Sequence, residues 1–175
     1  MKASLSSENQ KIVLGLDPGS RLSGYAVIAL ENKKTVHIHH GVIRLPTQKK
    51  MPQRLIYFAN EFKKILREFK PNEFAIETIF TGKNIQSILK IGQVRGVALM
   101  LAAEDNCKIF EYPPAAIKMA IAGYGRATKE QINFMVQKLL RLKQKPYPLD
   151  VSDALAIAIC HIQTTQIQRK LGHIS

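Results

Sequence analysis

The sequence contains little cysteine, which excludes both a disulfide-stapled fold and a cysteine-rich zinc site. Its two cysteines, Cys107 and Cys160, lie far apart and show no metal-ligand spacing. Reduced thiols of this kind are typical of cytosolic proteins, so we expect a cytoplasmic location. No apolar stretch of about 18 residues is free of charge, and we expect no membrane span. We also find no signal-peptide pattern and no phosphate-binding loop of the form G-x-x-x-x-G-K-[ST].

Acidic residues are also scarce, which makes the chain strongly basic. It has 13 aspartates and glutamates against 26 lysines and arginines, giving a formal net charge of +13. An excess of this size favours a polyanionic partner, most often a nucleic acid. A membrane surface is the alternative, but it usually requires a single basic amphipathic helix. Here the basic residues are spread along the whole chain, so a nucleic acid is favoured.

Hydrophobic periodicity divides the chain into strands and helices. The expected strands cover residues 11–17, 24–31, 35–45, 74–77 and 108–112. An apolar stripe from Leu55 to Phe69 predicts the first helix. Two further helices are expected over residues 84–105 and 113–123. A fourth helix should follow the capping box at Thr128, and the last should begin near Asp150. Three strands come first, and strands then alternate with helices. This order predicts an α/β fold with a five-stranded mixed sheet flanked by helices.

The chain length suits one domain. Its 175 residues contain no internal repeat, low-complexity tract or linker. We expect residues 1–10 to form a frayed tail, residues 11–165 to form the single domain, and residues 166–175 to form a C-terminal tail.

Four carboxylates stand on elements that are expected to be buried. Asp17 ends the first strand, and Glu77 ends the fourth. Functional side chains in α/β sheets gather beyond the carboxyl ends of strands when those strands run parallel. Asp150 and Asp153 are three residues apart, which places both on one face of the last helix.

Each carboxylate also has a purely structural interpretation. Asp17 could belong to a turn with the Pro-Gly that follows it, Asp150 could be a helix N-cap, and Asp153 could complement the helix dipole. Together, however, buried carboxylates repel one another unless a cation lies between them. Oxygen ligands without histidine or thiolate suit Mg²⁺ or Mn²⁺. In a basic protein this pattern is typical of two-metal phosphoryl chemistry.

Five segments of the sequence, taken in order, resemble the RuvC-type Holliday-junction resolvases. These segments are LGLDPGSRLSGYAV, FAIETIF, GQVRGVA, FEYPPAAIK and DVSDALAIAI, and the resemblance covers residues 11–161. It implies a ribonuclease-H-like fold with metal-binding carboxylates at Asp17, Glu77, Asp150 and Asp153. It also implies two Mg²⁺ ions per site, with Mn²⁺ as a substitute, a homodimer that contacts through the glycine-containing helix 84–105, and the partners RuvA and RuvB. Packing of that helix on the chain's own sheet is the alternative.

The same resemblance implies roles for residues around the carboxylates. Lysines at the positions of Lys118 and Lys129 support phosphate binding and catalysis in the family. Lys129 also follows the Thr128 cap at a helix N-terminus, where a cation is disfavoured, which points weakly to function. Phe80 is expected either to stack on an unpaired base or to anchor its loop in the core. The expected DNA contacts are Phe80, Lys83, Lys118, Arg126 and Lys129.

The expected activity is therefore Mg²⁺-dependent, structure-selective endonuclease cleavage of four-way DNA junctions. Paired symmetric nicks would leave 5′-phosphate and 3′-hydroxyl ends, as recombination and repair require. Three alternatives remain open. One is another ribonuclease-H-like nuclease of the YqgF type, and another is a non-catalytic junction- or RNA-binding module. The third, a sugar-kinase or actin-like phosphate-binding lobe, needs two lobes and more residues than this chain has.

Overall fold

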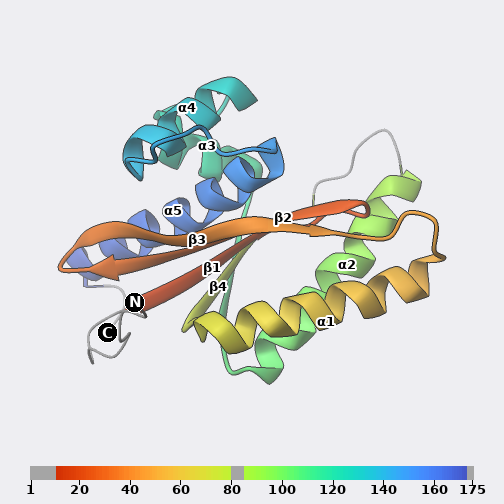
Figure 1. Ribbon diagram of the computed structural model, residues 1–175. Helices are drawn as coiled ribbons and strands as arrows, with labels where there is room; N and C mark the ends of the chain where they lie inside the picture. The colour runs from red at the N-terminus through yellow and green to blue at the C-terminus, as the bar shows by residue number, and fades with distance from the viewer. Residues whose placement is uncertain (1–10, 80–84, 173–175) are drawn as a thin grey trace.

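A five-stranded mixed sheet forms the centre of the computed structural model, which describes residues 11–79 and 85–172. The strand order is β3-β2-β1-β4-β5, with helices on both faces (Figure 1). The strands are β1 Lys11–Asp17, β2 Leu22–Glu31, β3 Lys34–Arg44, β4 Glu73–Glu77 and β5 Lys108–Tyr112. The helices are α1 Met51–Phe69, α2 Ile85–Glu104, α3 Pro114–Ala122, α4 Lys129–Leu139 and α5 Leu149–Lys170. The predicted five-stranded mixed sheet is confirmed.

The first three strands form an antiparallel meander. A two-residue turn joins β2 to β3, and both of its residues, Asn32 and Lys33, have positive φ angles of 48° and 65°. Such turns match the twist of the strands that they join. Asp17, the last residue of β1, pairs with Gly24 in the register of β1 and β2. The meander leaves β3 as an edge strand of the sheet.

The last two strands run parallel to β1. Leu16 pairs with Ile76, and Glu77 at the end of β4 pairs with Tyr112 at the end of β5. The carboxyl ends of β1 and β4 therefore lie side by side. This arrangement brings Asp17 and Glu77 to the same edge of the sheet, as the sequence predicts.

The helices divide the core into two layers. Helices α3, α4 and α5 cover one face, and α1 and α2 cover the other. Helix α5 is buried along most of its length, and a Cβ atom at Gly15 of β1 would collide with its Ala154 carbonyl oxygen. Gly24 likewise leaves room for the Asp150 carbonyl oxygen. The two glycines allow α5 to lie directly on the strands.

Two helices bear on expectations about chain segments. The last helix continues through Lys170, so the predicted boundary of the tail at residue 166 falls inside α5. By length and composition alone, α2 could cross a membrane, although no uncharged run was found in the sequence. Within its apolar sequence α2 carries Lys90 and Arg95, and Ala98 and Ala102 pack into the core of the sheet.

Candidate active site

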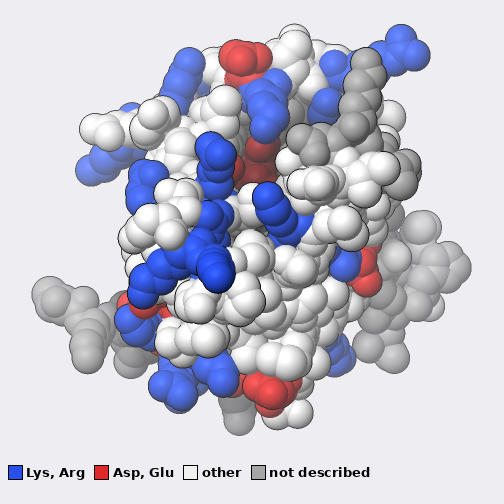
Figure 2. Space-filling model, turned by 90° about the vertical axis from the view of Figure 1, so that its right-hand side faces the viewer, with Lys and Arg blue, Asp and Glu red and all other residues white. Residues whose placement is uncertain are grey.

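A pocket of about 190 Å³ opens at the carboxyl ends of β1 and β4. Its polar lining consists of Asp17 from β1, Glu77 from β4, Lys118 from α3, Lys129 from α4 and Asp153 from α5. We call this set the acidic pocket. Its wall is completed by apolar residues of α3, α4 and α5. Figure 2 shows acidic side chains at the bottom of a hollow that lysine and arginine side chains surround.

Asp150 lies beside the acidic pocket and does not line it. Its side chain does not cap α5, because Pro148 is the N-cap residue of that helix and makes no side-chain capping bond. The N-cap interpretation of Asp150 is therefore wrong, although the residue does lie in the first turn. Its negative charge still reaches Asp17, because it helps to raise the pKa of that carboxyl group.

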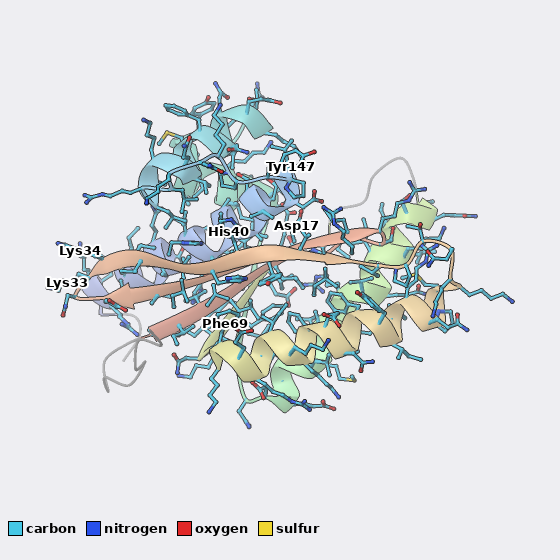
Figure 3. The ribbon with its side chains drawn as sticks, in the orientation of Figure 1. Asp17, Lys33, Lys34, His40, Phe69 and Tyr147 are labelled. Atoms are coloured by element: carbon cyan, nitrogen blue, oxygen red, sulfur yellow. The ribbon has the colours of Figure 1, made fainter. Side chains whose placement is uncertain are left out.

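The structure also disfavours the turn interpretation of Asp17 and the helix-dipole interpretation of Asp153. The turn after β1 is held by Ser23, whose hydroxyl accepts a hydrogen bond from the Gly19 amide at 3.0 Å and donates one to the Gly19 carbonyl oxygen at 3.2 Å. The Asp17 side chain, labelled in Figure 3, instead lines the acidic pocket. Asp153 lies beyond the first turn of α5, where the helix dipole has little effect.

The carboxylates of the acidic pocket repel one another. Burial raises the pKa of Asp17 well above its ordinary value, and the charges of Asp153, Glu77 and Asp150 raise it further. Burial also raises the pKa of Glu77, and Asp153 adds to that effect. Groups that share a confined space and disfavour each other's ionisation are common in functional sites. A bound cation would favour the ionised forms.

One lysine already supplies positive charge to this site. Lys129 Nζ donates a hydrogen bond to Asp153 Oδ2 at 3.1 Å, and the charge of Asp153 raises the pKa of Lys129. The predicted capping box is present, with Thr128 and Gln131 bonded reciprocally at the start of α4. It holds Lys129 at the first helical position. Lys118 lines the same pocket from α3, where its side chain is half-buried.

The donor chemistry of the acidic pocket fits a hard divalent cation. It offers carboxylate oxygens and contains no histidine or cysteine. Among residues 11–79 and 85–172, no three acidic, histidine or cysteine side chains yet lie close enough together to form a ligand cluster. A cation bound here would be held by the Asp17, Glu77 and Asp153 carboxylates, and it would compete with Lys129 for Asp153.

Arg126, another predicted DNA contact, does not line the acidic pocket. Arg126 is exposed in the connection between α3 and α4, three residues before Lys129. Phe80 and Lys83 fall in the segment 80–84, outside the described residues, and their roles stay predictions.

Sequence reasoning missed Arg95 of α2. Its Nε donates to the backbone carbonyl oxygen of Glu77 at 3.3 Å, and its guanidinium forms an ion pair with Glu111 of β5. The side chain is largely buried, so these contacts hold the end of β4, where Glu77 enters the acidic pocket. The signal was the single arginine inside the apolar segment GQVRGVA.

A family model described as "Crossover junction endodeoxyribonuclease RuvC" matches residues 13–161. A protein of that name from Syntrophomonas wolfei is 43% identical over 155 residues, covering 89% of this chain and 90% of the relative. The protein of the same name from Protochlamydia amoebophila is 41% identical over 155 residues, covering 89% of this chain and 92% of the relative. The similarity thus spans nearly the whole length of each protein.

Solved structures show the same likeness. The Thermus thermophilus RuvC structure is 32% identical with a TM-score of 0.80, covering 93% of this chain and 97% of that one. T. thermophilus RuvC in complex with a Holliday junction substrate gives 30% identity and a TM-score of 0.83, with the same coverage. The yeast mitochondrial Holliday junction resolvase is 13% identical with a TM-score of 0.67, covering 93% of this chain and 83% of that one, and shows a likeness of fold alone. The expected ribonuclease-H-like fold is confirmed.

Proposed function

This chain belongs to the RuvC family of crossover junction endodeoxyribonucleases, and we propose that it is the nuclease that resolves four-way DNA junctions. One observation of the structure carries the chemistry. Carboxylates from β1, β4 and α5 meet in a single pocket together with two lysines. That combination can bind cations and a phosphodiester in the same place, which hydrolysis of DNA requires. The reaction is a metal-dependent phosphodiester hydrolysis.

The metal ligands in this proposal are Asp17, Glu77 and Asp153, with Asp150 completing the set from the edge of the pocket. Two Mg²⁺ ions, replaceable by Mn²⁺, would activate the attacking water and stabilise the leaving 3′ oxygen. The support for a cation is electrostatic, because each of the Asp17 and Glu77 carboxyls has a pKa raised by burial and by its acidic neighbours. Arg95 fixes the backbone at Glu77, so that carboxylate enters the pocket from a rigid strand end.

The two lysines of the pocket would bind the DNA. Lys118 approaches from α3 and Lys129 from α4, so they reach the pocket from two different helices. Their ammonium groups donate hydrogen bonds to phosphate oxygens and orient the scissile phosphate. When Lys129 binds a phosphate oxygen, it would give up its hydrogen bond to Asp153. The Asp153 carboxylate would then be free to bind cations. The products would carry 5′-phosphate and 3′-hydroxyl ends.

The proposed homodimer would use the outer face of α2. Ile85, Leu89 and Met100 are 70%, 63% and 53% exposed, and Gly96 lies on the same face by helical spacing. The inner face is already used, because Ala98 and Ala102 are fully buried against the chain's own sheet. An exposed apolar stripe of this kind favours a protein interface. A two-fold dimer would present two acidic pockets and make paired nicks.

Gly96 allows a clean test of the dimer. A Cβ atom at this position would meet nothing within 4 Å, so Gly96→Leu should leave the monomer folded. In the proposed interface the added side chain would separate the two helices. We expect sedimentation at micromolar concentration to show a dimer for the wild type and a monomer for the variant. A wild-type monomer, or a variant that remains dimeric, would contradict this interface.

Further parts of the proposal concern the cellular setting. The partners RuvA and RuvB and the cytoplasmic location follow from the family resemblance and from the two reduced thiols. Cys107 and Cys160 are both free and buried, and burial raises the pKa of each thiol to about 11, which suits unreactive structural cysteines. Copurification of tagged chain with RuvA and RuvB from lysate treated with nuclease would test the partners.

A nicking assay tests the function directly. Wild-type protein would be incubated with a synthetic four-way junction or with linear duplex, in Mg²⁺ or in EDTA. We expect paired symmetric nicks on the junction alone and none in EDTA. Junction binding without cleavage would support the non-catalytic module instead. Cleavage of an RNA-containing or linear substrate in preference to the junction would support a different ribonuclease-H-like nuclease.

A further inference from the structure

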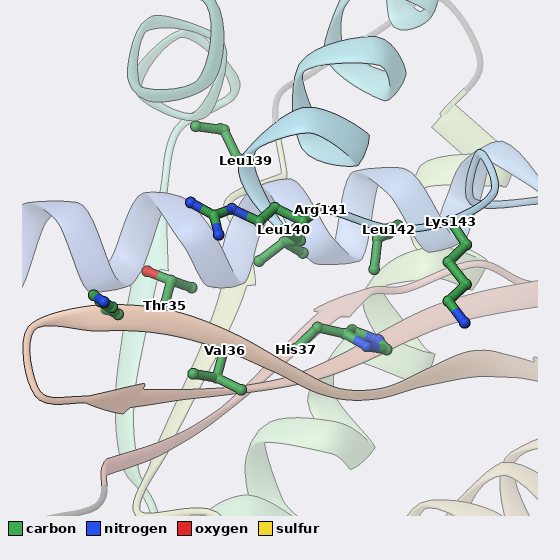
Figure 4. Close-up of a pocket in the computed structure, with 9 residues that line it drawn as sticks. Thr35, Val36, His37, Leu139, Leu140, Arg141, Leu142 and Lys143 are labelled. Atoms are coloured by element: carbon green, nitrogen blue, oxygen red, sulfur yellow. The ribbon is translucent and has the colours of Figure 1, made fainter.

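A second groove, separate from the acidic pocket, lies along the edge of the sheet. It has a volume of about 710 Å³ and runs between β3 and the chain that follows α4. We call it the basic groove, and Figure 4 shows most of its lining residues. The lining consists of Lys34, Thr35, Val36, His37, Leu139, Leu140, Arg141, Leu142 and Lys143.

The wall of the basic groove is held in place by specific contacts. Arg141 adopts a left-handed conformation with a φ of 52°, which reverses the chain at the end of α4. The Leu142 amide then donates to the Gln137 carbonyl oxygen at 3.0 Å. Farther along, the buried side chain of Asn133 donates to the Pro146 carbonyl oxygen at 3.0 Å. The connection between α4 and α5 is therefore preorganised beside β3.

The charge of the basic groove is of one sign. Its lining contains Lys34, Arg141 and Lys143, all exposed, and no aspartate or glutamate. Arg141 and Lys143 enter none of the ion pairs formed within the described ranges. Three lysine and arginine heads around one groove create a positive potential that attracts a polyanion. The groove therefore differs from the acidic pocket, where lysines and carboxylates are mixed.

The position of the basic groove relates it to the acidic pocket. Lys129, at the start of α4, lines the acidic pocket, and Leu139, at the end of α4, lines the basic groove. The ten residue steps from Lys129 to Leu139 span roughly 15 Å at the usual helical rise. That length corresponds to about four or five base pairs of duplex DNA. Lys138 and Lys145 are exposed on the same stretch of chain.

We propose that the basic groove binds the phosphate backbone of one junction arm, about four or five base pairs from the scissile phosphate. This proposal rests on the proposed junction-cleaving function and adds a second contact site for its substrate. Lys34, Arg141 and Lys143 would bind phosphates without reading the bases. Their role is to fix the direction in which an arm leaves the acidic pocket. An acidic peptide laid against the edge strand β3 is the competing occupant.

The first experiment combines charge removal in the protein with charge removal in the DNA. The groove variant carries Lys34→Gln, Arg141→Gln and Lys143→Gln. The matched control carries Lys63→Gln, Arg67→Gln and Lys70→Gln at the exposed side and end of α1. Both remove three charges, and Lys70, like Arg141, has a positive φ. All binding is measured in an Asp17→Asn background, so that the junction stays intact.

The groove variant should bind the junction more weakly and with less salt dependence. We expect a loss on the order of 10- to 100-fold near 0.1 M salt, with the slope of log K against log salt reduced by about 2 to 3. The control should change binding much less. Neutral methylphosphonate linkages placed about four or five base pairs from the scissile phosphate should weaken junction binding by the parent protein but not by the groove variant. If the methylphosphonate linkages weakened binding by the groove variant as much as by the parent protein at every position, the proposal would be overturned.

A cleavage assay distinguishes failure of the groove proposal from failure of the junction-cleaving function on which it rests. With Asp17 intact, the groove variant should still nick the junction in Mg²⁺, but a higher protein concentration should be needed to reach half of its maximal rate. If the wild type nicks no junction in Mg²⁺, the function itself fails. If the groove variant binds and nicks like the wild type at every salt concentration, only the groove proposal fails. Tighter binding of an alternating Glu-Val peptide by the wild type than by the groove variant would then assign the groove to a protein partner.

Discussion

Two groups of polar residues take charged side chains from opposite ends of the same two strands, β1 and β4. The acidic pocket takes Asp17 from the end of β1 and Glu77 from the end of β4. A second group takes Lys11 from the start of β1 and Glu73 from the start of β4, and adds Tyr112 of β5 and His161 of α5. We call this second group the buried network. Helix α5 contributes to both groups, through Asp153 and His161.

The buried network is fully paired. His161 is completely buried, its Nε2 lies 2.6 Å from Glu73 Oε2, and its Nδ1 lies 2.7 Å from the Tyr112 hydroxyl. Lys11 forms an ion pair with the other oxygen of Glu73. Burial by itself would raise the pKa of Glu73, but the hydrogen bonds from His161 and Lys11 lower it overall. This carboxylate is therefore stabilised in its ionised form.

The acidic pocket has the opposite balance. Its carboxyl groups face each other, and the pKa values of Asp17 and Glu77 are raised by burial and then by neighbouring negative charges. Within the described ranges, the one ion pair of this pocket joins Lys129 to Asp153 at 3.1 Å. The comparison teaches that two carboxylate groups on the same strands can serve different purposes. The paired carboxylate of the buried network joins its elements, whereas the carboxylates of the acidic pocket repel one another and would be stabilised by a cation.

The largest expected effect comes from removing a charge of the acidic pocket. Asp17→Asn should lower the rate of junction nicking by at least about 10³-fold, because bound metal supplies several kcal/mol of transition-state stabilisation. The fold and junction binding should persist, as circular dichroism and gel-shift assays would show. Cleavage that survives this substitution would mean that Asp17 has no part in metal binding.

The next largest effect comes from breaking the buried network. Glu73→Ala leaves His161 and Lys11 without their partner and should lower the free energy of unfolding by about 3–5 kcal/mol. Urea unfolding followed by circular dichroism measures the change. Glu61→Ala removes the exposed partner of Lys64 and serves as the control, with an unfolding midpoint close to that of the wild type. Equal unfolding midpoints for Glu73→Ala and Glu61→Ala would refute the stabilising role of the buried network.

A smaller effect is expected for the lysine that bridges the acidic pocket. Lys129→Ala should lower the cleavage rate about 10- to 100-fold, the value of one hydrogen bond to a charged group. Because the substitution also frees Asp153, we expect Mn²⁺ to bind at least as tightly as to the wild type by isothermal titration calorimetry. Weaker Mn²⁺ binding together with slower cleavage would place Lys129 in support of the ligands instead of the phosphate.

The smallest effect is a pH dependence of stability. The folded-state pKa of Asp17 is raised above its ordinary value of 3.8, so its ionisation opposes folding as the pH rises through and above that value. The stability of the wild type relative to Asp17→Asn should therefore fall from acidic to neutral pH. Mg²⁺ should reverse part of this fall in the wild type alone.

Thermal unfolding of both proteins from pH 4 to pH 8, with and without Mg²⁺, would measure this difference. Glu73 has the opposite sign, because its pKa is lowered, and its contribution is lost only as the pH falls through its folded-state value. Taking the difference between the wild type and Asp17→Asn removes that contribution. Parallel pH curves for the two proteins would show that Asp17 carries no electrostatic strain.

Local pattern in the sequence determined most of the elements and the choice of candidate metal-binding carboxylates. The apolar runs that end on Asp17 and Glu77, the capping box at Thr128 and the stop at Gly123 were all readable, because each depends on neighbours a few residues away. The four carboxylates could be selected for the same reason. The end of α5 was placed too early, because the helix continues to Lys170 through residues that are half-buried or exposed and give no clear apolar period.

The tertiary structure decided which charges meet. It placed Asp153 in the acidic pocket and Asp150 beside it, joined Glu73 to His161 across 88 residues of sequence, and brought β3 against the end of α4 to form the basic groove. It also revealed Arg95 behind Glu77. Such contacts depend on strand order and helix packing. Periodicity reveals which face of an element is buried, but only the packed chain determines what that face touches.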